Sequence, residues 1–164
     1  MADSSAIKFR VLTVNTHKGF ALFNRRFILH ELREAVRGVS ADVVFLQEVI
    51  GSSTRIVRPG RRRVAMLTSP HYEYLADSIW SDFAYGRNAV HTHGDHGNAV
   101  LSKFPITRYE NRDVSIRGPE RRGLLHCVLR IPGREIDLHV ICVHLGLKET
   151  HRYRQLEMVC EMVG

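Results

Sequence analysis

The segment that most restricts how this chain can fold is ADVVFLQEV, residues 41–49. Its apolar run is continuous and rich in β-branched residues, a pattern typical of a central strand that is covered on both faces. A sheet with such a strand needs a packed layer on each side. The run ends at Gln47 and Glu48, and a carboxylate is rare in apolar surroundings unless it is paired or binds a cation.

The sequence before this segment predicts a strand and a helix. Residues 7–14, IKFRVLTV, alternate and then become continuously apolar, as a strand entering a buried sheet does. Asn24 can cap a helix over about residues 25–39, in which apolar side chains recur at spacings of three and four. A strand, a helix and a second strand indicate that the chain begins as an α/β fold.

The middle of the chain predicts mainly strands and turns. Residues 51–69 have a loop-like composition that includes the basic run at 58–63, which we expect to be a mobile loop. Residues 71–90 predict a short strand and a loop. Strands separated by Gly and Pro turns are then predicted at 97–102, 105–116, 124–131 and 135–144. A mixed sheet, or two packed sheets flanked by helices, would satisfy this order.

The last segment, residues 150–163, predicts a helix with Thr150 available as its N-cap. One face of this helix is apolar and consists of Leu156, Val159, Cys160 and Val163. The length of 164 residues is that of one ordinary domain, and no internal repeat divides it. We therefore expect residues 1–164 to belong to a single domain.

The chain is basic, with 24 Lys and Arg against 17 Asp and Glu and a formal net charge of +7. The planar guanidinium of arginine offers five donors that suit phosphate, so an anionic substrate or nucleic acid is one interpretation of this charge. A solvated basic surface is the other. The composition alone leaves both open.

The cysteines indicate a reducing compartment. Cys127, Cys142 and Cys160 each lie in an apolar segment, none forms C-x-x-C, and an odd count gives no disulfide framework. We therefore expect buried, unreactive thiols. The N-terminal MADSSAIKFR lacks the apolar core of a signal peptide, and no stretch approaches the length of a membrane span. These features predict a soluble cytoplasmic protein, without stable membrane insertion and without an evident obligate protein partner.

Three polar residues follow or end predicted strands and are candidates for chemistry. Glu48 lies at the carboxyl end of the most apolar strand, where ligands gather in α/β sheets, although it could also simply emerge into solvent. His144 ends the strand in LHVICVHLGL and could be a general acid or a phosphate donor, or a hydrogen-bonded core histidine. Asn15 directly follows the first strand and could cap a turn, orient a carboxylate or touch an ion.

The stretch HTHGDHGNAVLS, residues 91–102, resembles a metal site. His91, His93, Asp95 and His96 fit the H-x-H-x-D-H pattern of dizinc hydrolases of the metallo-β-lactamase type. That loop normally follows a strongly apolar strand, leads into a Gly-rich helix start and needs later ligands of the P-G-H type, and this chain has none of these features. We therefore expect a polar loop here, with a dizinc hydrolase as the rival enzyme class.

Four blocks of sequence together resemble a known family. VLTVNTHKGF, ADVVFLQEV, GNAVLSKFPI and VHLGL, in that order, are similar to the N-terminal part of the endonuclease/exonuclease/phosphatase superfamily. The superfamily includes DNase I-like nucleases, abasic-site endonucleases, neutral sphingomyelinases and inositol polyphosphate phosphatases. The run NTHKGFALFNRRFILHELREAV is most similar to an uncharacterised bacterial branch. The resemblance spans nearly all of the chain and implies a DNase I-like, four-layer α-β-β-α sandwich.

The resemblance also implies a metal-dependent phosphoesterase and assigns roles to four residues. Asn15 and Glu48 would build a site for Mg²⁺, or for Mn²⁺, and His144 would contact the scissile phosphate. Arg122 stands where several members place a basic residue near the substrate. The substrate is a phosphate ester whose class stays open: nucleic acid, a phospholipid headgroup, or a sugar or inositol phosphate. In this mechanism the cation stabilises charge on the phosphoryl oxygens while a water attacks in line.

Two further blocks of the superfamily are absent from the sequence. One is G-D-[FW]-N, whose Asp activates the attacking water, and the other is S-D-H near the end of the domain. GDHGN at residues 94–98 is not the first of these, because it precedes NAVLS instead of following VHLGL. We therefore expect residues 1–164 to be the first two-thirds or so of one incomplete domain that is inactive by itself. A non-catalytic folding unit or binding remnant is the alternative.

Overall fold

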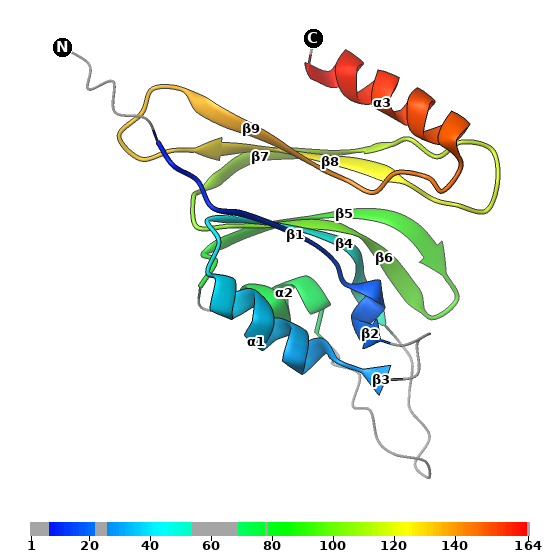
Figure 1. The fold of residues 1–164 in the computed structure, drawn as a ribbon, viewed down its shortest axis with the longest axis horizontal. Helices are drawn as coiled ribbons and strands as arrows, with labels where there is room; N and C mark the ends of the chain where they lie inside the picture. The colour runs from blue at the N-terminus through cyan, green and yellow to red at the C-terminus, as the bar shows by residue number, and fades with distance from the viewer. Residues whose placement is uncertain (1–6, 22–25, 54–68, 78, 164) are drawn as a thin grey trace.

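The computed structural model describes residues 7–21, 26–53, 69–77 and 79–163, and these form four layers (Figure 1). Helices α1 (Leu29–Val39) and α2 (His71–Ala76) cover one face of a four-stranded sheet. A three-stranded sheet packs on the other face, and helix α3 (Glu149–Val163) lies on its outer side. The predicted α-β-β-α sandwich is confirmed. None of the helices in the described ranges has the length and apolar character that a membrane crossing requires.

The four-stranded sheet has the strand order β1-β4-β6-β5. Its strands are β1 (Val11–Asn15), β4 (Val43–Ser53), β5 (Asp82–His91) and β6 (Gly94–Ser102). β4 pairs in parallel with β1 and antiparallel with β6. Between β1 and α1 lie a 3-10 turn, η1 (His17–Gly19), and a short antiparallel pair, β2 (Phe20–Ala21) and β3 (Arg26–Phe27).

The three-stranded sheet is an antiparallel meander of β7 (Ile106–Asp113), β8 (Gly123–Arg130) and β9 (Asp137–Val143). Its inner face packs on the first sheet through side chains such as Leu125 and Cys142. In Figure 1 the two sheets lie face to face between the helical layers.

Strand β4 contributes to both hydrophobic cores. Val44 and Leu46 pack in the core between the helices and the first sheet, together with Trp80, whereas Val43 packs in the core between the two sheets. Each of these side chains is 2% exposed or less. The prediction of a central strand covered on both faces is therefore confirmed, although the strand extends to Ser53.

The prediction for residues 71–90 is wrong. Instead of a short strand and a loop, the structure has helix α2 followed by the ten-residue strand β5. β5 is an edge strand whose Ala84 and Gly86 are buried while Arg87 and Val90 are exposed. An edge strand with several exposed positions has a mixed composition, and this composition hides it from a search for apolar runs.

Helix α1 begins later than its pattern predicts. It starts at Leu29 after Ile28, which makes no side-chain cap, and residues 26–27 pair with β2 instead of joining the helix. The predicted cap Asn24 and the basic run at 58–63 lie outside the described residues. The other predicted strands and the terminal helix are confirmed, with small shifts at their ends.

Helix α3 does not bury its predicted apolar face against the described part of the chain. Leu156 and Val163 are 46% and 66% exposed, and the buried side chain is Gln155. Gln155 Nε2 donates to the carbonyl of Val114, and its Oε1 accepts from the amide of Gly146. Hydrogen bonds to two loops, rather than apolar contacts, therefore fix the start of α3.

The expectation of buried thiols holds for two cysteines and fails for the third. Cys127 and Cys142 are buried, and burial raises the pKa of each thiol to about 12. Cys160 is exposed on α3, because the helical face to which it belongs is not covered by described residues.

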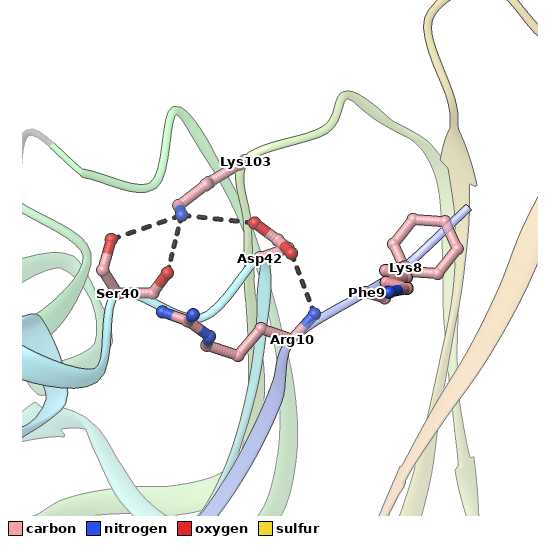
Figure 2. A pocket seen from close by; sticks show the side chains of 6 residues that line it. All are labelled: Lys8, Phe9, Arg10, Ser40, Asp42 and Lys103. Atoms are coloured by element: carbon pink, nitrogen blue, oxygen red, sulfur yellow. Dashed lines mark hydrogen bonds and ion pairs between the residues drawn. The ribbon is translucent and has the colours of Figure 1, made fainter. Parts of the chain in front are cut away.

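The edge of the sandwich where β1 and β4 begin is closed by a polar network (Figure 2). Lys103 Nζ donates to the carbonyl of Ser40 and to Asp42, and the amide of Arg10 donates to the other carboxylate oxygen of Asp42. The hydrogen bond from Arg10, followed by Lys103, lowers the pKa of Asp42. These groups border a cavity of about 520 Å³, but they are paired with one another, so the network joins the end of α1 to β1 and β4.

Candidate active site

A second cavity, of about 90 Å³, lies at the other end of the first sheet. It brings together three of the four residues predicted from the sequence, Glu48, His144 and Arg122, and Asn15 contacts it through Glu48. The complete lining is Lys18, Glu48, Asn88, His96, Gly97, Asn98, Arg121, Arg122 and His144. The sequence did not identify the other lining residues as part of this site. They come from the loop after β1, from β5 and β6, and from the loop before β8.

Glu48 reaches this cavity because β4 contains a bulge. Leu46 faces Ala99 and Val49 faces Gly97, so the two residues between them are opposite a single residue of β6. Val49 thereby takes the place in the helix-side core that strict alternation would assign to Glu48. Glu48 has φ 54, a left-handed conformation that costs a side-chain-bearing residue about 1–2 kcal/mol. The bulge turns the carboxylate away from the core.

The contacts of Glu48 hold its carboxylate in place. Asn15 Nδ2 donates to Oε1 at 3.3 Å, and His144 Nε2 and His17 Nδ1 lie 3.8 and 3.9 Å from Oε1 and Oε2. Asn15 is itself fixed, since its Oδ1 accepts from the amide of His17 at 2.9 Å. The hydroxyl of Thr16 donates to the carbonyls of Gln47 and Glu48 and so stabilises the bulge.

The turn after β1 brings Lys18 to the cavity. His17, Lys18 and Gly19 have φ values of 45, 57 and 82. Two consecutive side-chain-bearing residues in the left-handed region are costly, and such strain is frequent at functional sites. The amide of Gly19 donates to the carbonyl of Thr16 and closes the turn.

Both histidines of the cavity have lowered pKa values. Burial and then the neighbouring Arg122 lower the pKa of His144. Burial and then Lys18 lower the pKa of His96 to about 4. Both imidazoles are therefore neutral near pH 7, and each can donate from one ring nitrogen and accept at the other.

Arg122 has a partly occupied guanidinium. Its Nε donates to the carbonyl of Leu145 at 3.2 Å, its Nη1 donates to the carbonyl of Arg121, and its Nη2 lies 3.6 Å from a carboxylate oxygen of Glu120. These contacts fasten the loop that follows His144. A contact between Arg122 and substrate phosphate remains a prediction.

The donor set of the cavity suits a hard, well-hydrated cation. Glu48 is its carboxylate, and Asn98 adds a fully buried amide. Nowhere in the described ranges do three His, Cys, Asp or Glu side chains gather in a way that could hold a metal. Zinc requires three or four such ligands, whereas Mg²⁺ is held by one or two carboxylates and retains several waters. The cavity therefore fits Mg²⁺ or Mn²⁺ better than zinc.

The H-x-H-x-D-H stretch forms a β-hairpin and not the predicted loop. His91 ends β5, His93 lies in the turn, and Asp95 and His96 belong to β6. Asp95 accepts hydrogen bonds from Tyr85 Oη at 2.6 Å and from Ser52 Oγ at 2.5 Å, while His96 lines the cavity with Glu48. Neighbouring residues of a strand point to opposite faces, so these four side chains do not converge on one ion.

Comparison with known proteins places this geometry in context. Residues 12–157 match the sequence profile of the Endonuclease/Exonuclease/phosphatase family. The chain is 60% identical over 162 residues to "Uncharacterized protein YbhP" of Escherichia coli K12, a match that covers 99% of this chain and 63% of the relative. The chain thus spans less than two-thirds of the length of this curated relative.

Solved structures share the fold. An endonuclease/exonuclease/phosphatase from Beutenbergia cavernae superposes with a TM-score of 0.71 at 21% identity, covering 93% of this chain and 43% of that one. TDP2 of D. rerio, crystallised with a single-strand DNA product, superposes with a TM-score of 0.57 at 19% identity, covering 93% of this chain and 52% of that one.

Proposed function

Because the chain belongs to the endonuclease/exonuclease/phosphatase family, we propose that the protein hydrolyses phosphate esters with a divalent cation at Glu48. One observation carries the proposal most directly. The bulge in β4 directs the Glu48 carboxylate into the same cavity of about 90 Å³ as His144 and three basic side chains. Phosphoryl transfer requires a carboxylate that binds the metal cation and basic side chains that bind the anionic phosphate.

Glu48 and Asn15 would hold the cation, which is Mg²⁺ or, alternatively, Mn²⁺. The amide of Asn15 orients the carboxylate, and its Oδ1 retains a lone pair beyond the one that accepts from His17. When bound, the cation supplies positive charge that stabilises the phosphoryl oxygens. The strained backbone at Glu48 keeps its carboxylate directed at this position.

His144 and the basic side chains act on the substrate. The neutral imidazole of His144 donates a hydrogen bond to a phosphoryl oxygen as negative charge builds there. Lys18, Arg121 and Arg122 lie around the same cavity and attract the anionic group. We assign to Arg122 one phosphate contact through the N–H groups that its loop contacts leave available.

A substrate panel tests the activity. The assayed protein should extend residues 1–164 to the length of the curated relatives, and the panel should contain single-stranded DNA, a phospholipid and an inositol phosphate. Nucleic acid is the first choice, because a structural neighbour was crystallised with a DNA product and this chain carries a net charge of +7. Affinity that falls steeply with salt would support nucleic acid.

Two variants test the residue roles. Glu48→Gln should abolish Mg²⁺-dependent turnover, and His144→Ala should lower it by about two orders of magnitude. Glu34→Gln on the exposed face of α1 is the matched control and should leave turnover unchanged. Near-normal turnover by Glu48→Gln would show that the assignment is wrong.

We further propose that residues 1–164 form one incomplete domain in the cytoplasm and do not turn over substrate alone. The proposal rests on the missing G-D-[FW]-N block, whose Asp would position the attacking water, since positioning is a large part of catalysis. The second candidate is a binding unit without catalysis. It is favoured if the longer protein binds a phosphate ester yet never hydrolyses one, and Mg²⁺-dependent turnover by the 164-residue chain would refute the incomplete domain.

A further inference from the structure

Asn98 lies at the point where the carboxylate enters the cavity. It is 0% exposed and is the β6 residue opposite the bulge, between the pairs Leu46–Ala99 and Val49–Gly97. Two residues of β4 face it at this point, and one of them is Glu48. The strand register alone therefore keeps Asn98 beside Glu48.

The hydrogen bonds of Asn98 fix which of its atoms is left for a ligand. Its Nδ2 donates to the carbonyls of Gly123 at 2.9 Å and Cys142 at 3.3 Å. Carbonyl oxygens only accept, so the nitrogen must occupy this side. Its Oδ1 is buried and has no hydrogen-bond donor among the residues that the structure describes. A buried acceptor without a donor is costly, so this atom indicates a partner that the described residues do not supply.

His96 adds a second unpaired atom on the same side of β6. It lies two positions before Asn98, so both side chains point to one face of the strand. Its Nδ1 is buried and also lacks a partner within the described ranges. The low pKa of His96 keeps the ring neutral, so one of its nitrogens is an acceptor.

The lining of the cavity contains both donors and acceptors. Lys18, Arg121 and Arg122 supply donors, whereas Glu48 and Asn98 supply acceptors. A phosphate oxygen cannot bond to Asn98 Oδ1, because both atoms accept. The cavity of about 90 Å³ has room for several waters, and Mg²⁺ retains several of its waters in proteins.

We propose that Asn98 is a positioning residue whose Oδ1 accepts a hydrogen bond from a water of the cation that Glu48 binds. The inference rests on the proposed function and adds to it a contact in the second coordination sphere, with His96 as a further acceptor. Such outer contacts orient the ligands of a metal, and their loss typically lowers metal affinity about 10- to 100-fold.

An NMR titration of the unmodified chain with Mg²⁺ is the first test. The backbone amide of Glu48 and the side-chain amide of Asn98 should shift together with one dissociation constant, while the side-chain amide of Asn111 should shift far less. Asn111 is the matched control, since its Nδ2 also donates to a carbonyl and its Oδ1 is also unpaired among the described residues, but it does not line the cavity. Shifts at Glu48 without Asn98 would overturn the inference and leave the cation site intact. No shift at either residue would overturn both.

A pair of substitutions separates positioning from packing. Asn98→Asp and Asn98→Leu both lose the hydrogen bonds to Gly123 and Cys142, so a purely structural role predicts the same effect of both on Mg²⁺ affinity. The proposal predicts opposite effects: the aspartate variant should raise the affinity about tenfold by adding an opposite charge, and the leucine variant should lower it about tenfold or more. The same pair at Asn111 should leave the affinity nearly unchanged. Equal effects of the two substitutions at Asn98 would overturn the proposal, and the titration above decides the case if either variant does not fold.

Discussion

The left-handed backbone at Glu48 predicts an unusual response to substitution. Both Glu48→Gly and Glu48→Ala remove the carboxylate and its contacts, so the difference between the two variants reports the backbone alone. At φ 54 alanine retains the left-handed cost of about 1–2 kcal/mol, from which glycine is free. Glycine loses about 0.5–1 kcal/mol through its more flexible unfolded state. The glycine variant should therefore be more stable than the alanine variant by about 0.5–1 kcal/mol.

The same two substitutions at Glu34 should have the opposite order of stability. It is exposed in the middle of α1, where glycine is about 1 kcal/mol less stable than alanine. The preference between glycine and alanine should therefore reverse between the two positions. Because both pairs start from glutamate, differences in the removed side chain cancel within each pair.

Urea unfolding measures these differences. The single tryptophan, Trp80, is 1% exposed and donates from Nε1 to the carbonyl of Ala41, so its fluorescence reports loss of the helix-side core. With a slope of about 2 kcal/mol/M, a difference of about 1 kcal/mol moves the midpoint by about 0.5 M. If Glu48→Ala were as stable as Glu48→Gly, the strained bulge would not exist in solution and the account of how Glu48 reaches the cavity would be wrong.

Three further predictions concern other parts of the fold. Gly97→Ala should destabilise the chain by more than about 1 kcal/mol in urea unfolding, because the new Cβ would lie 1.9 Å from a carbonyl oxygen of β5. Gly38→Ala in α1 should instead stabilise the chain by about 1 kcal/mol, because no atom lies within 4 Å of the new Cβ. Burial lowers the pKa of His71 from 6.5 to about 4, so the contribution of the neutral imidazole to the free energy of unfolding should be full above pH 6.5 and fall by about 3 kcal/mol at most as the pH drops to 4. The free energy of unfolding of His71→Gln should depend less on pH across this window, and an identical pH dependence would contradict the prediction. Replacing His91 and His93 together by alanine should leave Mg²⁺-dependent turnover of the longer protein mostly intact, and loss of stoichiometric zinc together with activity would contradict this interpretation.

The fold could be predicted where the composition of a segment reports its surroundings. The apolar run of residues 41–49 identified the central strand, because a strand between two cores has no polar face. Edge strand β5 was missed, because several of its positions are exposed and its composition is therefore mixed. The periodicity of residues 150–163 identified the apolar face of α3, but periodicity reports a face that could be covered and not whether the described residues cover it.

The candidate site could be predicted only in part. Glu48 and His144 were found because each ends an apolar strand, which is where α/β sheets bind ligands. Asn98 was not found, because an asparagine inside a small-residue strand indicates only tight packing until the opposite strand is known. His96 was assigned to a loop, although the alternation from Val100 through Asn98 to His96 on one face of β6 could have placed it beside the site.

Backbone strain in the described residues independently separates the site from the rest of the chain. Five side-chain-bearing residues there have positive φ. Ser40 ends α1 in the left-handed region, which is an ordinary way to satisfy the last carbonyls of a helix. Asp77 ends α2 with φ 47 and ψ -136, and its carboxylate is held by Arg33 and Arg37. The others are His17, Lys18 and Glu48, and none of them caps an α-helix. His17 lies beside the carboxylate of Glu48, and both Lys18 and Glu48 line the cavity. Since strain persists only where surrounding contacts enforce it, the fold gives up stability at these three residues, and the side chains that line the cavity from there are a carboxylate, Glu48, and a cation, Lys18.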